Sequence, residues 1–305
     1  MNFVNSPRRP SAATVRPTAR LRGATLAAAM AITLAPAAPL GAQKPTPGDE
    51  RTVTPKDTAN KQRQQTLFTY RDAILAGGFA ILTVAMFPVD REIAKGLTDS
   101  SLTTNRFLEH SANGVEVITA PGAYIIGGSL YAFGRIAHKP NVADLGWHGT
   151  EAVLLATTIT GVLKGSLGRA RPFVTNDTNP TDFKIGGGFG NGERQSFPSG
   201  HTTTAFAVAS SVTSEMRRLH PSSLKFVAPV MYGGATLVGL SRMYHNKHWA
   251  SDVVLGAAIG TFSGLKVVRY SHAHPHNKVD RIILGTTIAL NGYGDAALGF
   301  TLPAP

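Results

Sequence analysis

Six long apolar segments follow one another along the chain, and polar stretches separate them. Each is rich in Ala, Gly and Thr and is longer than an ordinary strand, so each predicts an α-helix. Residues 279–303 alternate weakly in polarity around Asn291 and Gly292, which is typical of a terminal strand pair or of a packed tail. The pattern therefore predicts an all-α fold, a six-helix bundle with a short β-like tail, whose helices lie at residues 70–87, 116–135, 147–168, 201–216, 226–242 and 252–268.

The N-terminal part of the chain has a different character. Residues 1–22 contain five arginines and no acidic residue, residues 23–40 are apolar, and small residues surround Ala42. We interpret 1–42 as a signal peptide, with a retained membrane anchor as the alternative. The polar residues 43–66 predict a disordered linker, which leaves a helical domain at 67–271 and a C-terminal tail at 272–305.

Charge and composition narrow the function. The formal net charge is +12, and although part of it belongs to the predicted signal peptide, the remainder favours anionic substrates or membrane surfaces. The basic residues are scattered and not interleaved with aromatic residues, so nucleic acid is not an expected partner. The absence of cysteine excludes disulfides, thiol catalysis and cysteine metal sites. Oligomeric state has no signature in the sequence.

Three basic residues are candidates for binding an oxyanion. Lys164 and Arg171 lie seven residues apart, a spacing that returns to within roughly 20° of the same face of one helix. Pro172 is then expected to end that helix. Arg242 supplies a third cation from the fifth predicted helix. An Arg fork and a Lys point charge together suit a phosphate group, whose charge is spread over several oxygens.

The tetrapeptide Pro198 to His201 precedes the fourth predicted helix. Ser199 is then placed at the helix N-cap, where free backbone N–H groups point at an anion. Gly200 allows a close approach of the backbone, so its N–H and the Ser199 hydroxyl are candidate phosphate donors. His201 follows in a position to act as general acid and base, because an imidazole titrates near neutral pH.

His248 and Asp252 lie four residues apart, on one face of a predicted helix. The carboxylate is expected to hold one imidazole nitrogen and to leave the other free, which makes His248 an oriented nucleophile. We predict attack of His248 on phosphorus, a phosphohistidine intermediate, and proton transfers by His201. The three cations take the part that a metal ion plays in other phosphatases, so neither a metal nor another cofactor is expected.

Taken together, these segments read K-x6-RP, PSGH and SR-x5-H-x3-D. This order and spacing resembles the signature of the phosphatidic acid phosphatase type 2 and vanadium haloperoxidase superfamily, without departure at any position, over about residues 154–252. The resemblance implies a catalytic helical domain with the same roles: nucleophile His248, acid and base His201, orienting Asp252, and phosphate binding by Lys164, Arg171, Ser199, Gly200 and Arg242.

The substrate stays open between two classes. The apolar helices favour a lipid phosphate or diphosphate, whereas the signal peptide and the short helices favour a soluble phosphate ester, as in nonspecific acid phosphatases. A vanadate-dependent haloperoxidase and a catalytically silent binding protein are the further alternatives. The uncharged stretches run about 12 to 18 residues where a spanning helix needs around 20. We therefore favour an exported bundle, periplasmic or at the membrane surface, over an integral membrane enzyme.

Several further polar residues outside the signature could bind a metal or a substrate. His272, His274 and His276 alternate and could chelate a divalent metal, but a polar loop after the last helix is the favoured interpretation. Glu193 and Arg194, just before Pro198 to His201, are candidates for contacting substrate, but a solvated loop is the favoured interpretation. The glycine-rich loop 176–195 is expected to be flexible and either covers the site or serves as a spacer.

Overall fold

The computed structural model describes residues 68–98, 119–274, 277–284, 286–290 and 296–300, together with residues 110, 112 and 114. The predicted signal peptide and linker lie outside these residues. Within them, every one of the six predicted helices is present, so the expectation of a helical bundle is confirmed. The helices are α3 (Tyr70–Met86), α7 (Ala120–Ile136), α8 (Pro140–Leu167), α9 (Gly200–Leu219), α10 (Leu224–Tyr244) and α11 (Ala250–Ala273).

Some elements were not expected from the hydrophobic pattern. A 3-10 turn, η1 (Phe87–Val89), joins α3 to the short helix α4 (Asp90–Leu97), and α12 (Lys278–Leu284) follows α11. Helix α8 also begins earlier than predicted, because Pro140 lies in its first turn, where a proline suits the helix. Further 3-10 turns are η2 (Pro172–Thr175), η3 (Gly192–Arg194) and η4 (Pro221–Ser223).

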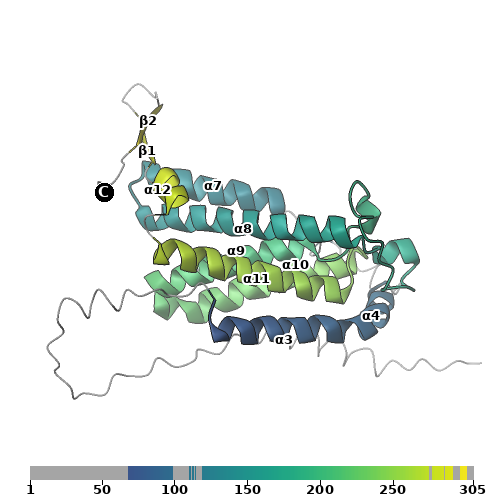
Figure 1. Cartoon of the computed structure of the whole chain (residues 1–305). Helices are drawn as coiled ribbons and strands as arrows, with labels where there is room; N and C mark the ends of the chain where they lie inside the picture. Colours follow the sequence, from purple (N-terminus) through teal and green to yellow (C-terminus); the bar gives the residue numbers. More distant parts are fainter. Residues whose placement is uncertain are drawn as a thin grey trace, which may run out of the picture.

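A pair of strands follows α12. Strands β1 (Thr286–Leu290) and β2 (Ala296–Phe300) pair antiparallel, with Thr286 opposite Phe300. This confirms the short β-like tail, and Figure 1 places it at one end of the bundle, beside α12 and the beginning of α8. The hydroxyl of Tyr131 on α7 donates to the carbonyl of Ile283, and this bond fastens α12 to the bundle.

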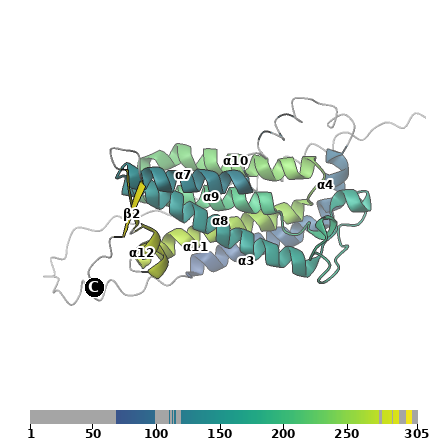
Figure 2. The ribbon, with the colours of Figure 1, turned by 90° about the horizontal axis from the view of Figure 1, so that it is seen from above.

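The long helices lie alongside one another in both views (Figures 1 and 2). Helix α9 is central and packs against α8, α10 and α11, while α3 packs against α11 and α7 against α8. Small residues allow α9 and α11 to approach closely. A Cβ added at Gly260 would lie 2.3 Å from the carbonyl oxygen of Thr203, and one at Gly264 would lie 2.7 Å from that of Ala207. A larger residue at either position would force the two helices apart.

Helix α3 is fastened to α11 by a cluster of charged groups. One carboxylate oxygen of Asp72 lies 2.5 Å from Lys266 Nζ and 2.8 Å from Arg269 Nη1. Asp72 also closes a capping box with Thr69 at the start of α3. The same side chain therefore caps one helix and ties it to another.

Three segments of the described chain are long and apolar enough to cross a membrane, as judged by length and composition. They are Tyr70–Leu97, Pro221–Tyr244 and Ala250–Ala273. In the first two, only 11% and 22% of the most apolar window is buried inside the protein, so α3 and α10 present apolar surface outward. Ile74, Ile81 and Val84 on α3 and Phe226 and Val230 on α10 are all more than half exposed. These features support association with a membrane.

Candidate active site

Four helix ends meet at the end of the bundle away from the strand pair. Helices α8 and α10 end there, α9 and α11 begin there, and α4 lies beside them (Figure 1). The residues of the three sequence segments are distributed over these ends and over the turns that follow or precede them. Side chains from distant parts of the sequence are thus directed to one region.

The prediction that Lys164 and Arg171 share a helix face is wrong. Helix α8 ends at Leu167, and Gly168 adopts a left-handed conformation with φ of 57°. A Cβ at Gly168 would lie 2.1 Å from the carbonyl oxygen of Lys184, so only glycine fits this turn. Arg171 instead lies on extended backbone before η2. The chain turns early at Gly168, and Lys164 and Arg171 approach the site from different directions.

Ser199 is the N-cap of α9, as predicted, and Gly200 and His201 are its first two residues. Ser199 is fully buried, and its hydroxyl accepts a hydrogen bond of 2.9 Å from Thr202. A Cβ added at Gly200 would lie 3.6 Å from Lys164 Cε, so Lys164 extends over the start of the helix. The N-terminus of α9 and the Lys164 ammonium therefore offer positive charge at the same place.

His248 is held by a backbone carbonyl, which the sequence did not indicate. Its Nδ1 lies 2.7 Å from the carbonyl oxygen of Ser196, whereas the Asp252 carboxylate is 3.5 Å away. Because a carbonyl oxygen only accepts, Nδ1 carries the proton and Nε2 has the free lone pair. Burial lowers the pKa of His248 to about 3, and the positive charge of Lys164 contributes in the same direction. The imidazole is therefore neutral and nucleophilic at ordinary pH.

Asp252 connects the surrounding segments. Its Oδ2 accepts hydrogen bonds from the Ser196 hydroxyl at 2.5 Å and from the Trp249 N–H at 2.8 Å. Its Oδ1 lies 2.6 Å from Arg169 Nη1. Since Ser196 also provides the acceptor for His248, Asp252 orients the imidazole mainly by fixing the segment that holds it.

Arg169 forms a buried ionic network with Asp252 and Asp90. Its guanidinium lies 2.7 Å from Asp90 Oδ2 on α4 in addition to its bond to Asp252, and Ser251 bridges to both Arg169 and Asp90. The guanidinium carbon lies 4.7 to 5.5 Å from four aromatic ring centroids, those of Phe87, Phe183, Phe197 and Trp249. Both carboxylates of the network are thus compensated by one fully enclosed cation.

Lys164, Arg171 and Arg242 form a group of mutually repelling cations. Burial lowers the pKa of Lys164 to about 7, and the charges of Arg171 and Arg242 oppose the attraction of Asp252. Burial and Arg242 likewise lower the pKa of Arg171. The Asp252 carboxylate that acts on both Lys164 and Arg171 is already paired with Arg169. A bound anion would relieve this repulsion, so the arrangement favours an oxyanion site beside His248 Nε2.

Comparison with known proteins agrees with this geometry. Residues 146–275 match the family described as the PAP2 superfamily. This segment of the chain is therefore similar to the PAP2 superfamily. All of the predicted site residues fall inside the matched segment. The expected resemblance to the phosphatidic acid phosphatase type 2 and haloperoxidase group is therefore confirmed.

Two curated relatives and one solved structure are similar to this chain. The lipid A 1-phosphatase of Porphyromonas gingivalis is 44% identical over 69 residues, which are 23% of this chain and 15% of that protein. A probable diacylglycerol pyrophosphate phosphatase 1 of Schizosaccharomyces pombe is 29% identical over 161 residues, 43% of this chain and 55% of that protein. The matches thus span about half or less of these relatives. The crystal structure of a transmembrane PAP2 type phosphatidylglycerolphosphate phosphatase from Bacillus subtilis shares the fold, with a TM-score of 0.50 and 23% identity over 69% of this chain and all of that one.

The glycine-rich loop 176–195 packs on the end of α8. The N–H groups of Gly186 and Gly188 donate to the carbonyls of Ser166 and Gly165, which satisfies acceptors that the helix leaves unpaired. Lys164 Nζ donates to the carbonyl oxygen of Gln195. The loop therefore holds the Lys164 side chain in place.

Glu193 and Arg194 have structural contacts in this loop. Arg194 forms a bidentate pair with Asp182, at 3.1 and 3.0 Å. The carbonyl oxygen of Glu193 accepts the Arg171 N–H at 3.0 Å. These contacts shape the loop and hold the backbone of Arg171.

Proposed function

We propose that this PAP2 domain is a metal-independent phosphatase that hydrolyses lipid phosphates or diphosphates through a phosphohistidine. The observation that carries the proposal is the convergence of three cations and one neutral, buried imidazole. Lys164, Arg171 and Arg242 supply the charge that a phosphoryl group needs in its transition state. His248 supplies a free nitrogen lone pair, because its Nδ1–H is donated to Ser196.

The proposed reaction has two displacements at phosphorus. In the first, His248 Nε2 forms a bond to phosphorus while the ester P–O bond breaks, and His201 gives its proton to the departing oxygen. In the second, His201 takes a proton from water, the resulting hydroxide attacks phosphorus, and the P–N bond breaks. Inorganic phosphate leaves, and both histidines return to their initial states. Ser199 and Gly200 at the start of α9 are the proposed donors to the phosphoryl oxygens.

A lipid substrate is supported by the apolar surroundings of the site. An apolar cavity lies between α3, α9, α10 and α11, and Met243 and Ala250 in its wall are neighbours in sequence of Arg242 and Trp249. Helices α3 and α10 also present apolar side chains outward. The names of the relatives, a lipid A 1-phosphatase and a diacylglycerol pyrophosphate phosphatase, point to the same class. We further infer export, with the site at the outer face of the membrane, from the predicted signal peptide.

The substrate class is tested by phosphate release from the purified chain without added metal. Phosphatidate and undecaprenyl diphosphate in mixed micelles are compared with p-nitrophenyl phosphate, each with and without vanadate. We expect faster, vanadate-sensitive release from the lipids. Preference for the soluble ester would instead indicate an acid phosphatase. No release from any substrate, with bromide oxidation after addition of vanadate and peroxide, would contradict the hydrolase proposal and indicate a haloperoxidase.

Anion affinity is expected to fall as the pH rises through neutrality. The pKa of Lys164 is about 7, so the charged form that attracts an anion predominates below this value and is lost above it. Between pH 6 and pH 8 the association constant should fall by about tenfold. Inhibition by sulfate measures this, because the charge of sulfate is constant over the range.

The matched variant for this experiment is Lys164→Arg, which keeps a positive charge throughout the same range. Its sulfate inhibition should be nearly independent of pH between pH 6 and pH 8. Equal sulfate affinity of the unmodified chain at both pH values would contradict the role given to Lys164.

A further inference from the structure

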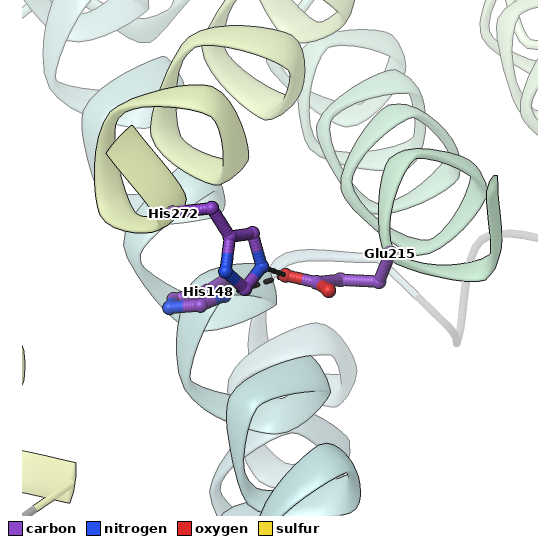
Figure 3. A group of neighbouring side chains, drawn as sticks. All are labelled: His148, Glu215 and His272. Atoms are coloured by element: carbon purple, nitrogen blue, oxygen red, sulfur yellow. Dashed lines mark hydrogen bonds and ion pairs between the residues drawn. The ribbon is translucent and has the colours of Figure 1, made fainter. Parts of the chain in front are cut away.

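A cluster of two histidines and a glutamate lies toward the end of the bundle away from His248. His148 is on α8, Glu215 is on α9 and His272 is on the last turn of α11. Figure 3 shows both imidazole rings directed at the Glu215 carboxylate. His148 Nδ1 lies 2.6 Å and His272 Nε2 lies 2.8 Å from the same oxygen, Oε1. The proposed phosphatase reaction uses none of these residues.

The cluster is buried and incompletely satisfied. The side chains of His148 and Glu215 are only 2% and 1% exposed, whereas His272 is 25% exposed and leaves a path from solvent. His148 Nε2 and Glu215 Oε2 are buried and have no hydrogen-bond partner. A buried polar atom without a partner is costly, so these two atoms point to a ligand.

The neighbouring charges favour a cation. His148 Nε2 faces Asp280 Oδ2 at 3.8 Å, and Glu151 groups with the same two residues. Asp280 is held in place by the Trp147 indole N–H at 3.1 Å and by Asn277. Arg218 lies 3.6 Å from Glu215 Oε2, but its side chain is 46% exposed and therefore offsets little of the negative charge.

A neutral His148 cannot donate a hydrogen bond to both neighbouring carboxylates, whereas a metal-bound His148 can satisfy both. With its proton on Nδ1, a neutral His148 directs the bare lone pair of Nε2 toward a carboxylate. If Nδ1 instead bound a metal, the proton would lie on Nε2 and would be donated to Asp280. A carboxylate that accepts from a metal-binding histidine in this way is a common arrangement at zinc sites.

We propose that His148 Nδ1, the Glu215 carboxylate and His272 Nε2 bind one divalent transition-metal ion, with zinc as the best match. Two imidazoles and one carboxylate are a known zinc ligand set, and a fourth position is left for water. The ligand atoms lie within 4.8 Å of one another. Bonds of about 2.0 to 2.1 Å in a tetrahedral site separate ligand atoms by about 3.3 Å, so small side-chain movements suffice. The ion would tie α8, α9 and α11 together and has no part in the reaction at His248.

The sequence run that first suggested metal binding contributes one ligand. His274 lies beyond the end of α11, where its ring stacks on Tyr270 at 4.5 Å between centroids, and His276 lies outside the described residues. His272 belongs to α11 and not to a polar loop, so the interpretation of this residue as part of a loop is wrong. Its partners come from α8 and α9, which no local sequence pattern could indicate.

The test is metal binding by the purified full-length chain in detergent. The protein is treated with a chelator, dialysed, and titrated with zinc, and metal content, calorimetry and thermal unfolding are recorded. We expect one zinc per chain with micromolar or tighter affinity and a rise in the midpoint of unfolding. Cobalt in place of zinc should give the visible absorption bands of a tetrahedral site. If the unmodified chain takes up no zinc, or if the cobalt form lacks these bands, the proposal is overturned by that result alone.

Variants locate the ion. His272→Gln and Glu215→Gln should each weaken zinc binding by about 100-fold or more, and Asp280→Asn by about 10- to 100-fold. His274→Gln, Glu151→Gln and His248→Gln are matched controls that should bind zinc like the unmodified chain. Loss of zinc binding in Glu151→Gln would indicate that the ion binds on the other side of His148. Loss in His248→Gln would indicate that it binds at the catalytic end of the bundle. Either result overturns the assignment.

Discussion

Replacing His248 with alanine is expected to lower turnover by at least about 10³-fold while the protein stays folded. The variant removes the nitrogen that attacks phosphorus, and the guanidinium groups of Arg171 and Arg242 cannot replace it because they stay charged. Substrate affinity should change much less than turnover, since these cations remain. Initial rates on a lipid phosphate and on p-nitrophenyl phosphate, with thermal unfolding as a folding control, measure the effect.

The intermediate offers a second measurement on the same variant. Rapid quenching of the unmodified enzyme with radiolabelled substrate should yield an acid-labile phosphohistidine, which His248→Ala should lack. His220→Ala is a suitable control, because His220 is exposed and caps the far end of α9. Equal residual activity in His248→Ala and His220→Ala would eliminate the covalent mechanism.

The second large effect concerns stability. We expect Arg169→Met to lower the free energy of unfolding by about 3 to 5 kcal/mol, because it leaves Asp90 and Asp252 as buried carboxylates without a cation. Methionine keeps most of the volume, so the change isolates the charge. Thermal unfolding in detergent and recovery of folded protein are the measurements.

Two further variants give the Arg169 prediction its controls. Arg194→Met breaks a partly exposed pair with Asp182 and should cost less than about 1 kcal/mol. Adding Asp90→Asn to Arg169→Met should recover part of the loss, since one of the two uncompensated charges disappears. A similar small effect of Arg169→Met and Arg194→Met would show that the buried network contributes little to stability.

Much of the fold was predictable because long apolar runs determine where helices form. Each of the six predicted runs overlaps a helix, and Ser199 begins α9 as its N-cap preference indicates. The predicted end of α8 is wrong because Pro172 is not the residue that stops the helix. Gly168 stops the helix earlier, and a glycine that follows a basic residue in the last helical turn, here Lys164, is a recognisable C-terminal signal.

The contacts that hold Asp252 and His248 in place could not be predicted from the sequence. Arg169 and Asp90 lie 79 residues apart, and nothing in the local pattern pairs them. The Ser196 carbonyl that fixes the imidazole is a backbone group, which every residue possesses. Spacing thus indicated the candidate side chains, whereas the groups that hold them in place depend on how distant helices pack.

The contact between Asp90 and Arg169 has a consequence for where the functional unit begins. The family match starts at residue 146, yet Asp90 on α4 neutralises the guanidinium that supports Asp252, and it also accepts the Ser251 N–H. A fragment limited to 146–275 would lack this carboxylate and the α3 helix that leads to it. We therefore expect the smallest autonomous piece of this protein to start no later than α3, about 80 residues before the family match begins.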